Sequence, residues 1–378
     1  MEPFTLNRQF LRQNSIDAFE SIIWTERYYG DSDIELVVPL TEDSLKKLGT
    51  GMFIGIPESD EIMMLETMLI EQSKKTIKFN GISLLSWLNN RFIRTSASHN
   101  EATWTIEGGP PGWVLWAIVW NMCHRDSPFL NGSIPMGVPF PDQLIIPGLE
   151  LKDYDRSGEN VVAVINYGPV YDGLREFATA YKIGMQITLE SANDSSYVLG
   201  FRSYKGVDRS GDQAMNPVVR FSPFTDSLTD ITELQSIAAL KTRVYSYAPN
   251  VTSPTPTDPG AWGLTGAPEF TGFDLRAMEV FVNELTNESI DPPGDAARLK
   301  QLLDIKAKDT LAANPLIKAV DGEIVPTSQY EYGRDYNLGD IIEVQGNSGI
   351  VTKCRVVEYI RSQDDAGQKS YPTVAALD

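Results

Sequence analysis

The sequence predicts a multi-domain α+β protein whose two ends are β-rich and whose middle is mixed α/β. Short runs of β-branched and aromatic residues occur near both termini, and amphipathic helical patterns occur at 113–124 and 171–181. Breaks rich in proline and glycine separate these parts. With 378 residues the chain is about two to three times as long as a usual single domain. We therefore expect three domains, over residues 1–104, 105–207 and 208–378.

The first domain reads as strands with short helices between them. Thr41 is a suitable N-cap for a short helix that ends near Leu48, because acids fill its first turn and lysines its last turn. A second helix is expected at 83–92, with its leucines on one side. A small β-barrel or sandwich flanked by helices would satisfy this pattern. The expected strands lie at residues 34–38, 52–56, 62–72 and 76–79.

The second domain begins with a glycine- and proline-rich break that precedes a predicted helix at 113–124. Pro111 suits the first turn of this helix. Three tryptophans, Trp113, Trp116 and Trp120, follow helical spacing, and we interpret them as a packed core or a subunit contact, with a ligand platform as the alternative. Five prolines make 126–148 an ordered loop. A strand at 161–165, a helix at 171–181 and a hairpin of 185–190 with 197–202 complete this domain.

The third domain combines β-strands with a helical insertion and a proline-rich loop at about 248–315. The proline-rich part, 253–260, is too rich in proline for regular structure, and Trp262, Phe270 and Phe273 could hold it against a surface. Two helices are expected, at 274–285 and 295–313. The expected strands lie at 218–221, 240–247, 329–332, 341–345 and 350–360.

Charge and cysteine content exclude several classes of protein. The chain has 51 acidic and 32 basic residues, a net charge of −19, so we expect it to be repelled by nucleic acid rather than to coat it, unless one small basic patch breaks the trend. Its two cysteines, Cys123 and Cys354, are too far apart in sequence to suggest a zinc motif or a disulfide framework. The N-terminus does not read as a signal peptide. The longest apolar stretch, 113–123, is well short of the roughly 20 residues that span a bilayer.

The histidines do not suggest a catalytic centre. Only His99 and His124 are present, and Cys123 cannot pair with His124 by adjacency, because neighbours on a helix point about 100° apart. The sequence also contains none of the common nucleophile, phosphate-loop, dinucleotide or zinc-protease motifs. We expect no enzymatic activity, no cofactor and no metal site.

Acidic residues offer two weak alternatives to this expectation. The segment Asp153–Gly158 resembles the opening of a calcium loop, but the twelfth position is Val164 where a glutamate is needed, which favours a polar turn. Asp31 with Asp33, and Asp364 with Asp365, could in principle serve glycoside hydrolysis. We interpret these pairs as solvated turns.

Two blocks of sequence resemble a family of siphovirus minor tail proteins, the hub-like proteins of phages with long non-contractile tails. The first block is Ala18–Gly30 followed by Ile34–Pro39. The second is Tyr332–Val344, followed by Arg355–Tyr359 and a Pro-Thr pair. Together the blocks bracket nearly the whole chain.

The resemblance implies a fold related to the baseplate hub of contractile tails, with two barrel domains similar to a tail-tube subunit in each protomer. Three protomers would then present six barrels, so that a homotrimer adapts a hexameric tube to a three-fold tip. The chain would be made in the host cytoplasm and reside in the virion at the tail tip. Its partners would be the tail tube or distal tail protein and the tip or receptor-binding proteins. DNA would pass through the lumen without specific binding, and no membrane anchor is expected.

The resemblance also singles out residues for a role in fold or assembly. In the first block, Trp24, Arg27 and Tyr28 should pack as an aromatic and cationic strand against the barrel. In the second block, Gly339 should supply a positive φ on entry to the strand that Asp340 begins. The complete set of motif residues is Trp24, Arg27, Tyr28, Tyr29, Leu338, Gly339 and Asp340.

Two functions remain as alternatives to a structural virion protein. One is a carbohydrate hydrolase that uses paired carboxylates, and the other is a glycan- or receptor-binding module that exposes Trp262 and neighbouring aromatic residues. Members of the family can carry a fused peptidoglycan hydrolase. The chain stops about 20 residues after Ile360, so we expect no lytic domain.

Overall fold

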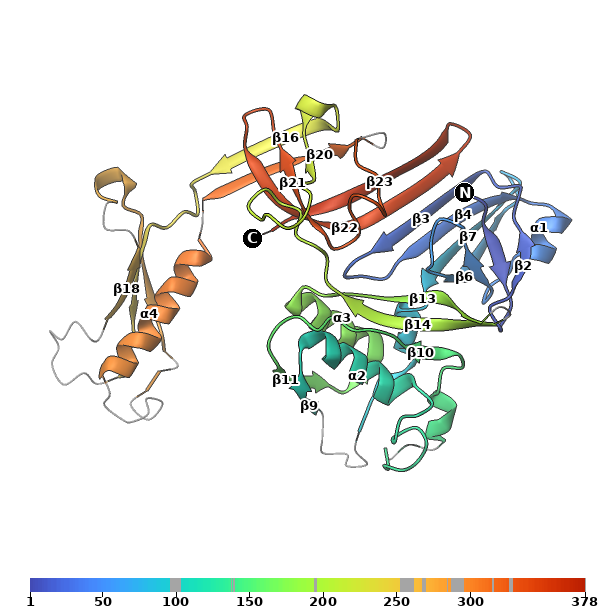
Figure 1. Ribbon diagram of the computed structural model, residues 1–378, viewed down its shortest axis with the longest axis horizontal. Helices are drawn as coiled ribbons and strands as arrows, with labels where there is room; N and C mark the ends of the chain where they lie inside the picture. The colour runs from blue at the N-terminus through green and yellow to red at the C-terminus, as the bar shows by residue number, and fades with distance from the viewer. Residues whose placement is uncertain are drawn as a thin grey trace. The chain divides into compact units, whose positions relative to one another are not determined.

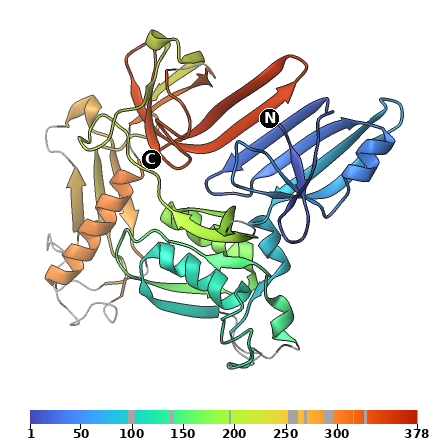
Figure 2. The ribbon, with the colours of Figure 1, turned by 45° about the vertical axis from the view of Figure 1, so that its right-hand side comes forward.

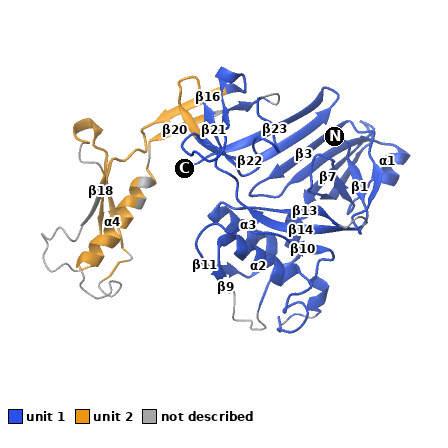
Figure 3. Cartoon of the chain, viewed as in Figure 1, with its two compact units in different colours: residues 1–230, 322–345, 353–378 blue, residues 231–321, 346–352 orange. Residues whose placement is uncertain are grey.

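The computed structural model describes residues 1–95, 103–136, 138, 140–193, 196–251, 262–266, 270–283, 285–286, 296–314, 316–325 and 329–377 (Figure 1). The chain divides into two compact units, which Figure 3 colours separately. Unit 1 comprises residues 1–230, 322–345 and 353–378, and unit 2 comprises 231–321 and 346–352. No helix in the described ranges is both long enough and apolar enough to cross a membrane.

The largest sheet of unit 1 has eleven strands drawn from both ends of the chain. Ten of them follow the order β15-β21-β22-β3-β4-β7-β6-β5-β1-β2, and β23 pairs with β22. The N-terminal strands are β1 (Phe4–Leu6), β2 (Arg12–Ser15), β3 (Ser21–Arg27), β4 (Asp33–Pro39), β5 (Phe53–Gly55), β6 (Met63–Glu71) and β7 (Thr76–Ser83). The others are β15 (Arg220–Phe221), β21 (Ile341–Gln345), β22 (Val351–Asp364) and β23 (Gly367–Ala376).

The inward-facing side chains of the N-terminal strands form the first hydrophobic core. In β4 the side chains of Ile34, Leu36 and Val38 are buried while their neighbours are partly exposed, as a period of two requires. Trp24 and Phe79 complete the same face from β3 and β7. Helix α1 (Glu42–Lys47) lies in the connection between β4 and β5. Thr41 caps this helix as predicted, and its hydroxyl oxygen accepts from the Ser44 amide at 3.1 Å.

The two ends of the chain meet where β22 pairs with β3. The pairing is antiparallel and runs from Glu358 opposite Arg27 to Gln363 opposite Ile22. In Figures 1 and 2 the red C-terminal strands accordingly lie beside the blue N-terminal strands. Segments more than 330 residues apart in sequence thereby form one hydrogen-bonded ladder.

The middle of the chain forms mixed α/β structure within unit 1. Helices α2 (Pro111–Cys123) and α3 (Val170–Tyr181) accompany a three-stranded sheet of order β10-β14-β13 and a two-stranded sheet of β11 and β9. Pro111 lies in the first turn of α2, as predicted. The strands are β8 (Phe92–Ile93), β9 (Thr103–Gly109), β10 (Leu149–Leu151), β11 (Val161–Asn166), β12 (Gly168–Pro169), β13 (Gly184–Asn193) and β14 (Ser196–Tyr204).

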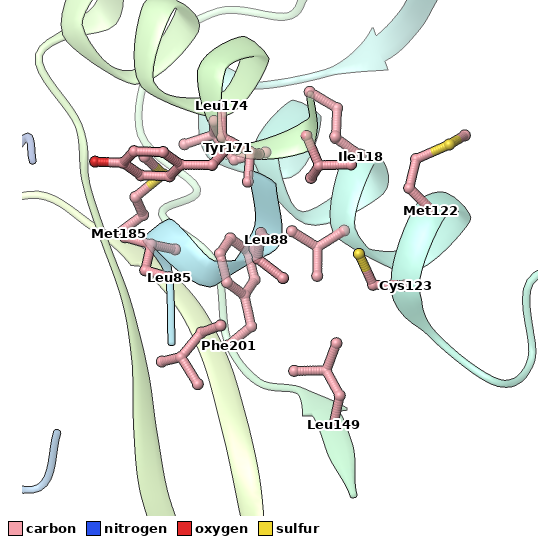
Figure 4. Close-up of a cluster of buried hydrophobic side chains, with 14 of the residues drawn as sticks. Leu85, Leu88, Ile118, Met122, Cys123, Leu149, Tyr171, Leu174, Met185 and Phe201 are labelled. Atoms are coloured by element: carbon pink, nitrogen blue, oxygen red, sulfur yellow. The ribbon is translucent and has the colours of Figure 1, made fainter. Parts of the chain in front are cut away.

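A second hydrophobic core fills the space between these helices and strands. Figure 4 shows side chains from α2, α3, β10, β13, β14 and the short 3-10 helix η1 (Ser86–Asn90) pointing toward one another. The face of α2 that enters this core is aliphatic, while its tryptophans are only half-buried. Trp113 and Trp116 pack against the margin of the core, and Trp116 stacks on Trp120 with ring centroids 6.0 Å apart. These contacts agree with a packing role for the tryptophans.

The described residues of unit 2 form a small sheet and one α-helix. Its sheet has the order β18-β17-β19, with β17 (Arg243–Tyr247), β18 (Trp262–Gly266) and β19 (Ala277–Phe281). Helix α4 (Ala296–Ala312) matches the expected helix at 295–313, and its Leu299 and Leu303 form a core with Ala248 and Val282. The chain enters unit 2 along β16 (Leu228–Ser236) and returns along β20 (Ile317–Ile324), two strands that pair. The side chain of Trp262 and the proline-rich segment 253–260 lie outside the described residues.

Three predicted elements are wrong. The expected helix at 83–92 is the end of β7 followed by η1 and β8, because pairing with β4 extends β7 to Ile82. The expected helix at 274–285 is instead the 3-10 turn η5 (Gly272–Asp274) and strand β19, which pairs in parallel with β17. The expected strand at 329–332 is a turn, in which Gly333 adopts a φ of 86° and the Asp335 carboxylate accepts from the Glu331 amide at 2.8 Å.

Several smaller elements lie in the long connections. The loop at 126–148 contains a single 3-10 turn among its described residues, η2 (Pro141–Leu144), and a further turn, η3 (Pro223–Thr225), follows β15. The fold is mostly sheet with few helices, as an α+β assignment requires. The path of the large sheet is open over the described residues, so the two closed barrels stay a prediction. The domain boundaries 1–104, 105–207 and 208–378 also stay predictions.

Candidate functional site

The motif residues from the two ends of the chain converge on the ring of Tyr28. Tyr28 follows β3 and is completely buried. A Cβ atom placed on Gly339 would lie 2.3 Å from the Tyr28 ring, and one placed on Gly184 would lie 2.2 Å from it. Such distances are impossible for carbon atoms, so the ring occupies space that only glycine leaves open. We call Tyr28, Gly184, Gly339, Asp340 and Arg355 the tyrosine junction.

The Tyr28 side chain is held at several points. Its hydroxyl lies 3.2 Å from the Lys182 carbonyl oxygen and 3.3 Å from that of Tyr204, each of which can accept its proton. Burial raises the pKa of Tyr28 to about 12, so the phenol stays a donor at neutral pH. The Arg355 guanidinium lies 5.4 Å from the ring centroid and donates to the Gly339 carbonyl oxygen at 2.6 Å.

Asp340 is the second fixed point of the tyrosine junction. Its carboxylate accepts from the Val207 amide at 2.7 Å, the Arg209 Nε at 2.7 Å and the Asn337 amide at 3.0 Å. Arg209 and Asp340 form an ion pair in which both side chains are largely buried, with exposed fractions of 14% for Arg209 and 3% for Asp340. Gly339 has a φ of 86°, as predicted, and β21 begins two residues later. Asp340 therefore ties the connection after β14 to the start of β21.

Arg27 and Tyr29 extend the junction along β3. The Arg27 guanidinium donates to Glu358 Oε1 at 2.7 Å and to the Asp31 carbonyl oxygen at 2.6 Å, and it also pairs with Asp33. It thus joins β3 to β22. The ring of Tyr29 meets Tyr28 edge to face, with centroids 4.6 Å apart. Leu338, the remaining residue of the second motif, is buried.

A buried acid pair lies next to the junction. Trp24 Nε1 donates to Glu26 Oε1 at 3.3 Å, and Arg361 Nη1 donates to the same oxygen at 2.8 Å. Arg361 also lies over the ring of Tyr359, which stacks on Tyr332 at 3.7 Å. Trp24, which the resemblance singled out, therefore orients a carboxylate in addition to filling the core.

Glu61 is the other member of the pair. Burial raises the pKa of Glu61, and the nearby charge of Glu26 raises it further, while a hydrogen bond from Ser32 and the charge of Arg361 oppose the shift. The two carboxyls and Arg361 line a cleft of about 260 Å³ that also includes Tyr204. Arg361 donates to Glu26, while Glu61 feels only its charge, and the raised pKa of Glu61 favours the protonated form of that carboxyl.

The acids considered for catalysis have structural partners instead. The Asp31 carboxylate accepts from the Tyr171 hydroxyl at 3.0 Å, and Asp33 pairs with Arg27. The Asp155 carboxylate accepts from the amide and hydroxyl of Ser157, which makes the calcium-like segment a polar turn. Asp364 and Asp365 lie at the turn between β22 and β23. Within the described ranges, acidic, histidine and cysteine side chains form no group that could hold a metal ion.

The cysteine and histidine candidates are equally unsuited to nucleophilic chemistry. Burial raises the pKa of Cys123 to about 12, so its thiol stays protonated at neutral pH. His124 is buried, and its Nδ1 accepts from the Asp126 amide at 3.2 Å. His99 lies outside the described residues.

Sequence reasoning missed several of the residues that build these clusters. Gly184, Glu61 and Arg361 belong to strands or turns without a motif of their own, and Arg355 was not singled out within its block. Arg355 had a weak signal, since it opens the last short block of family resemblance. The register between β3 and β22 brings Arg361 beside Glu26, whereas Gly184 belongs to β13 and Glu61 bridges Thr188 of the same strand.

The sequence was compared with known families and structures. The sequence profile of the family described as siphovirus ReqiPepy6 Gp37-like protein matches residues 4–243. The chain belongs to this family. The siphovirus ReqiPepy6 Gp37-like family is a family of phage tail proteins, and the predicted resemblance and the predicted location in the virion tail are thereby confirmed. No curated protein matches the chain.

Three solved structures of tail proteins are similar to this chain. The chain is similar to the 43 kDa tail protein of prophage MuSo2 from Shewanella oneidensis, with a TM-score of 0.51 and 12% identity over 99% of this chain and 98% of that chain. Tail protein gp18 of a Listeria monocytogenes EGD-e prophage matches with a TM-score of 0.48 and 13% identity, covering 99% and 94%. The tail protein from Neisseria meningitidis MC58 gives 0.48 and 11%, covering 100% and 97%.

Proposed function

We propose that this chain is the hub of a siphovirus tail, a trimer that joins the tail tube to the proteins of the tip. The observation that carries the proposal is the similarity of fold to a prophage tail protein over nearly the full length of both chains. Membership in a tail-protein family gives independent support for a structural role. A trimer in which each protomer supplies two tube-like domains would present six similar units to a six-fold tube.

The layout of the large sheet supports two related halves in each protomer. Strands β1 to β7 come from the range 1–104, and β15 with β21 to β23 come from 208–378, with β3 and β22 as the seam. In this proposal the range 105–207 is a peripheral domain, and the insertion at about 248–315 is a decoration of the second half.

The tyrosine junction would have a role in assembly by keeping this seam rigid. Tyr28 and Arg27 lie on one side of the seam, and Gly339 and Asp340 lie on the other. A hub must hold its protomers in one ring geometry, and a seam locked by an inflexible aromatic contact resists opening. Net charge of −19 would also suit a lumen through which DNA passes without being held.

The test is the stoichiometry of the chain in assembled tails. Cryo-electron microscopy and quantitative mass spectrometry of the virion should find three copies at the tip, in register with six-fold rings of tube protein. A reconstruction in which the copy number is not a multiple of three would refute the hub proposal. An inner wall lined with basic side chains would refute only the role given to the charge.

A carbohydrate hydrolase is the second candidate, favoured by one observation. The cleft that contains Glu26 and Glu61 combines a carboxyl of raised pKa with a carboxylate held by an arginine, an asymmetry used in acid–base catalysis. Glu26 is committed to Trp24 and Arg361, and Glu61 is only 7% exposed, which favours a structural role. Release of reducing sugar from host cell walls by the purified chain, abolished in Glu61→Gln, would favour the hydrolase.

A further inference from the structure

Unit 1 contains an apolar pocket of about 190 Å³, separate from the acidic cleft. Its walls come from the turn after β1, from β5 and β6, from the segment around η1, and from β10 and β14. All the lining residues except Arg8 are apolar, and most of them are buried. Among them are Phe10, Phe53, Met64, Leu84, Leu149 and Leu199.

The wall that carries Phe10 is fixed in place. Phe10 has a φ of 60°, a left-handed conformation that is uncommon for an aromatic residue. Asn7 holds the turn, because its side-chain oxygen accepts from the Gln9 and Leu11 amides at 2.9 Å each. Gly148 lies against the Phe10 ring, and a Cβ atom placed on Gly148 would lie 3.3 Å from a carbon of that ring. The pocket is therefore shaped before any ligand arrives.

Arg8 is the one charged residue that lines the pocket. Its side chain is exposed, and its guanidinium carbon lies 4.8 Å from the centroid of the Phe53 ring. No carboxylate among the described residues forms an ion pair with it, although the chain has 51 acidic residues to 32 basic ones. By contrast, Arg27, Arg209 and Arg361 each pair with a carboxylate.

We propose that this pocket binds an apolar group of about one aromatic ring that carries a terminal carboxylate, with the carboxylate at Arg8. Ligand sites are typically apolar concavities with a few polar groups that set orientation. An engineered apolar cavity of roughly 150 Å³ accepts benzene, so the volume here suffices for a substituted ring. A free aromatic acid and the C-terminal residue of a peptide share this chemistry.

The experiment is a titration of the full chain followed by nuclear magnetic resonance. The probes are 3-phenylpropionate, its uncharged amide, and N-acetyl-glycyl-phenylalanine with a free carboxylate. We expect saturable binding with a Kd on the order of 1 mM for a ligand of this size. The acid should bind about three- to five-fold more tightly than the amide, because the ion pair is partly exposed to solvent. Binding of the peptide alone would identify a chain terminus as the source, and binding of the free acid would identify a small molecule.

Two variants test the roles of the charge and the volume. Arg8→Gln should remove the preference for the acid, whereas Arg12→Gln should retain it. Arg12 is the matched control because it lies over the ring of Phe4 in the same hairpin but does not line the pocket. Leu199→Phe should fill the pocket and abolish binding without lowering the melting temperature.

Three results would overturn the proposal. They are no saturable binding of either acid, equal affinity for acid and amide, and binding that Leu199→Phe leaves unchanged. The melting temperature of Leu199→Phe guards against misfolding as an explanation. Leu36→Phe is the comparison for the melting temperature. Leu36 is fully buried in the other core, away from the pocket, so the added volume there should lower the melting temperature.

Discussion

Replacing Gly339 with alanine tests whether the tyrosine junction is as tight as its geometry indicates. The added Cβ would lie 2.3 Å from the Tyr28 ring, on a backbone with a φ of 86°. The ring has little room to retreat, because Gly184 presses on it and its hydroxyl is held by two carbonyl oxygens.

The expected cost has two parts. A left-handed alanine costs roughly 1–2 kcal/mol, and overpacking in a close-packed interior typically costs about 1–3 kcal/mol. Gly339→Ala should therefore lower the free energy of unfolding by about 2–5 kcal/mol, and the loss can be measured from urea denaturation followed by tryptophan fluorescence.

Gly333→Ala is the matched control for the backbone part. Gly333 also has a φ of 86°, but a Cβ atom there would meet open space. It should lose only the roughly 1–2 kcal/mol of the left-handed conformation. In a Tyr28→Leu background, the loss of unfolding free energy caused by Gly339→Ala should fall to that of Gly333→Ala. Equal losses for the two glycine variants in the parent chain would refute the steric reasoning.

Three further predictions address the other clusters. Asp340→Asn should lower the free energy of unfolding by about 3 kcal/mol, because it leaves the buried Arg209 guanidinium without its charge partner; urea denaturation measures the loss. Glu61→Gln should gain stability relative to the parent chain as pH rises. The folded-state pKa of Glu61, about 8, exceeds its ordinary value of 4.5, so the stabilisation from its proton is complete below pH 4.5 and lost as pH approaches 8. Cys123 should react with a thiol reagent only after unfolding, because it is buried and its pKa is raised to about 12.

Exposed residues of the same type supply the controls. Asp43→Asn, in a surface pair with Lys47, should change stability little, and a loss as large as that of Asp340→Asn would count against the burial argument. Glu66→Gln, on the exposed part of β6, is the matched Glu-to-Gln change outside the buried pair. If it follows Glu61→Gln, the titration belongs to another group. Rapid labelling of Cys123 in the native chain would show that the α2 core opens.

Local patterns in the sequence were sufficient where an element depends on its own neighbours. The run of β-favouring residues at 34–38, stopped by Pro39, identified β4, and the hydroxyl of Thr41 identified the start of α1. Helix α4 was found within one residue at each end. Residues 274–285 were misread, because β19 owes its extended form to pairing with β17 across about thirty residues of chain.

The candidate site was only partly visible for the same reason. The family resemblance identified Tyr28 and Gly339 as motif residues, and the positive φ predicted for Gly339 is confirmed. Nothing in the sequence indicated that Gly339 and Gly184 enclose one ring, or that Glu61 lies beside Glu26. Such contacts depend on three-dimensional proximity, which local composition does not encode.

The sequence by itself determined the α+β class, the tail-protein family, the acidic charge and the caps and alternation of individual elements. These properties follow from composition and from interactions over a few residues. Only the tertiary structure decided that β3 and β22 share a ladder and that Arg361 pairs with Glu26 beside the buried Glu61. Register between distant strands is chosen by the packing of whole faces, since a slip of one residue would turn every buried side chain outward.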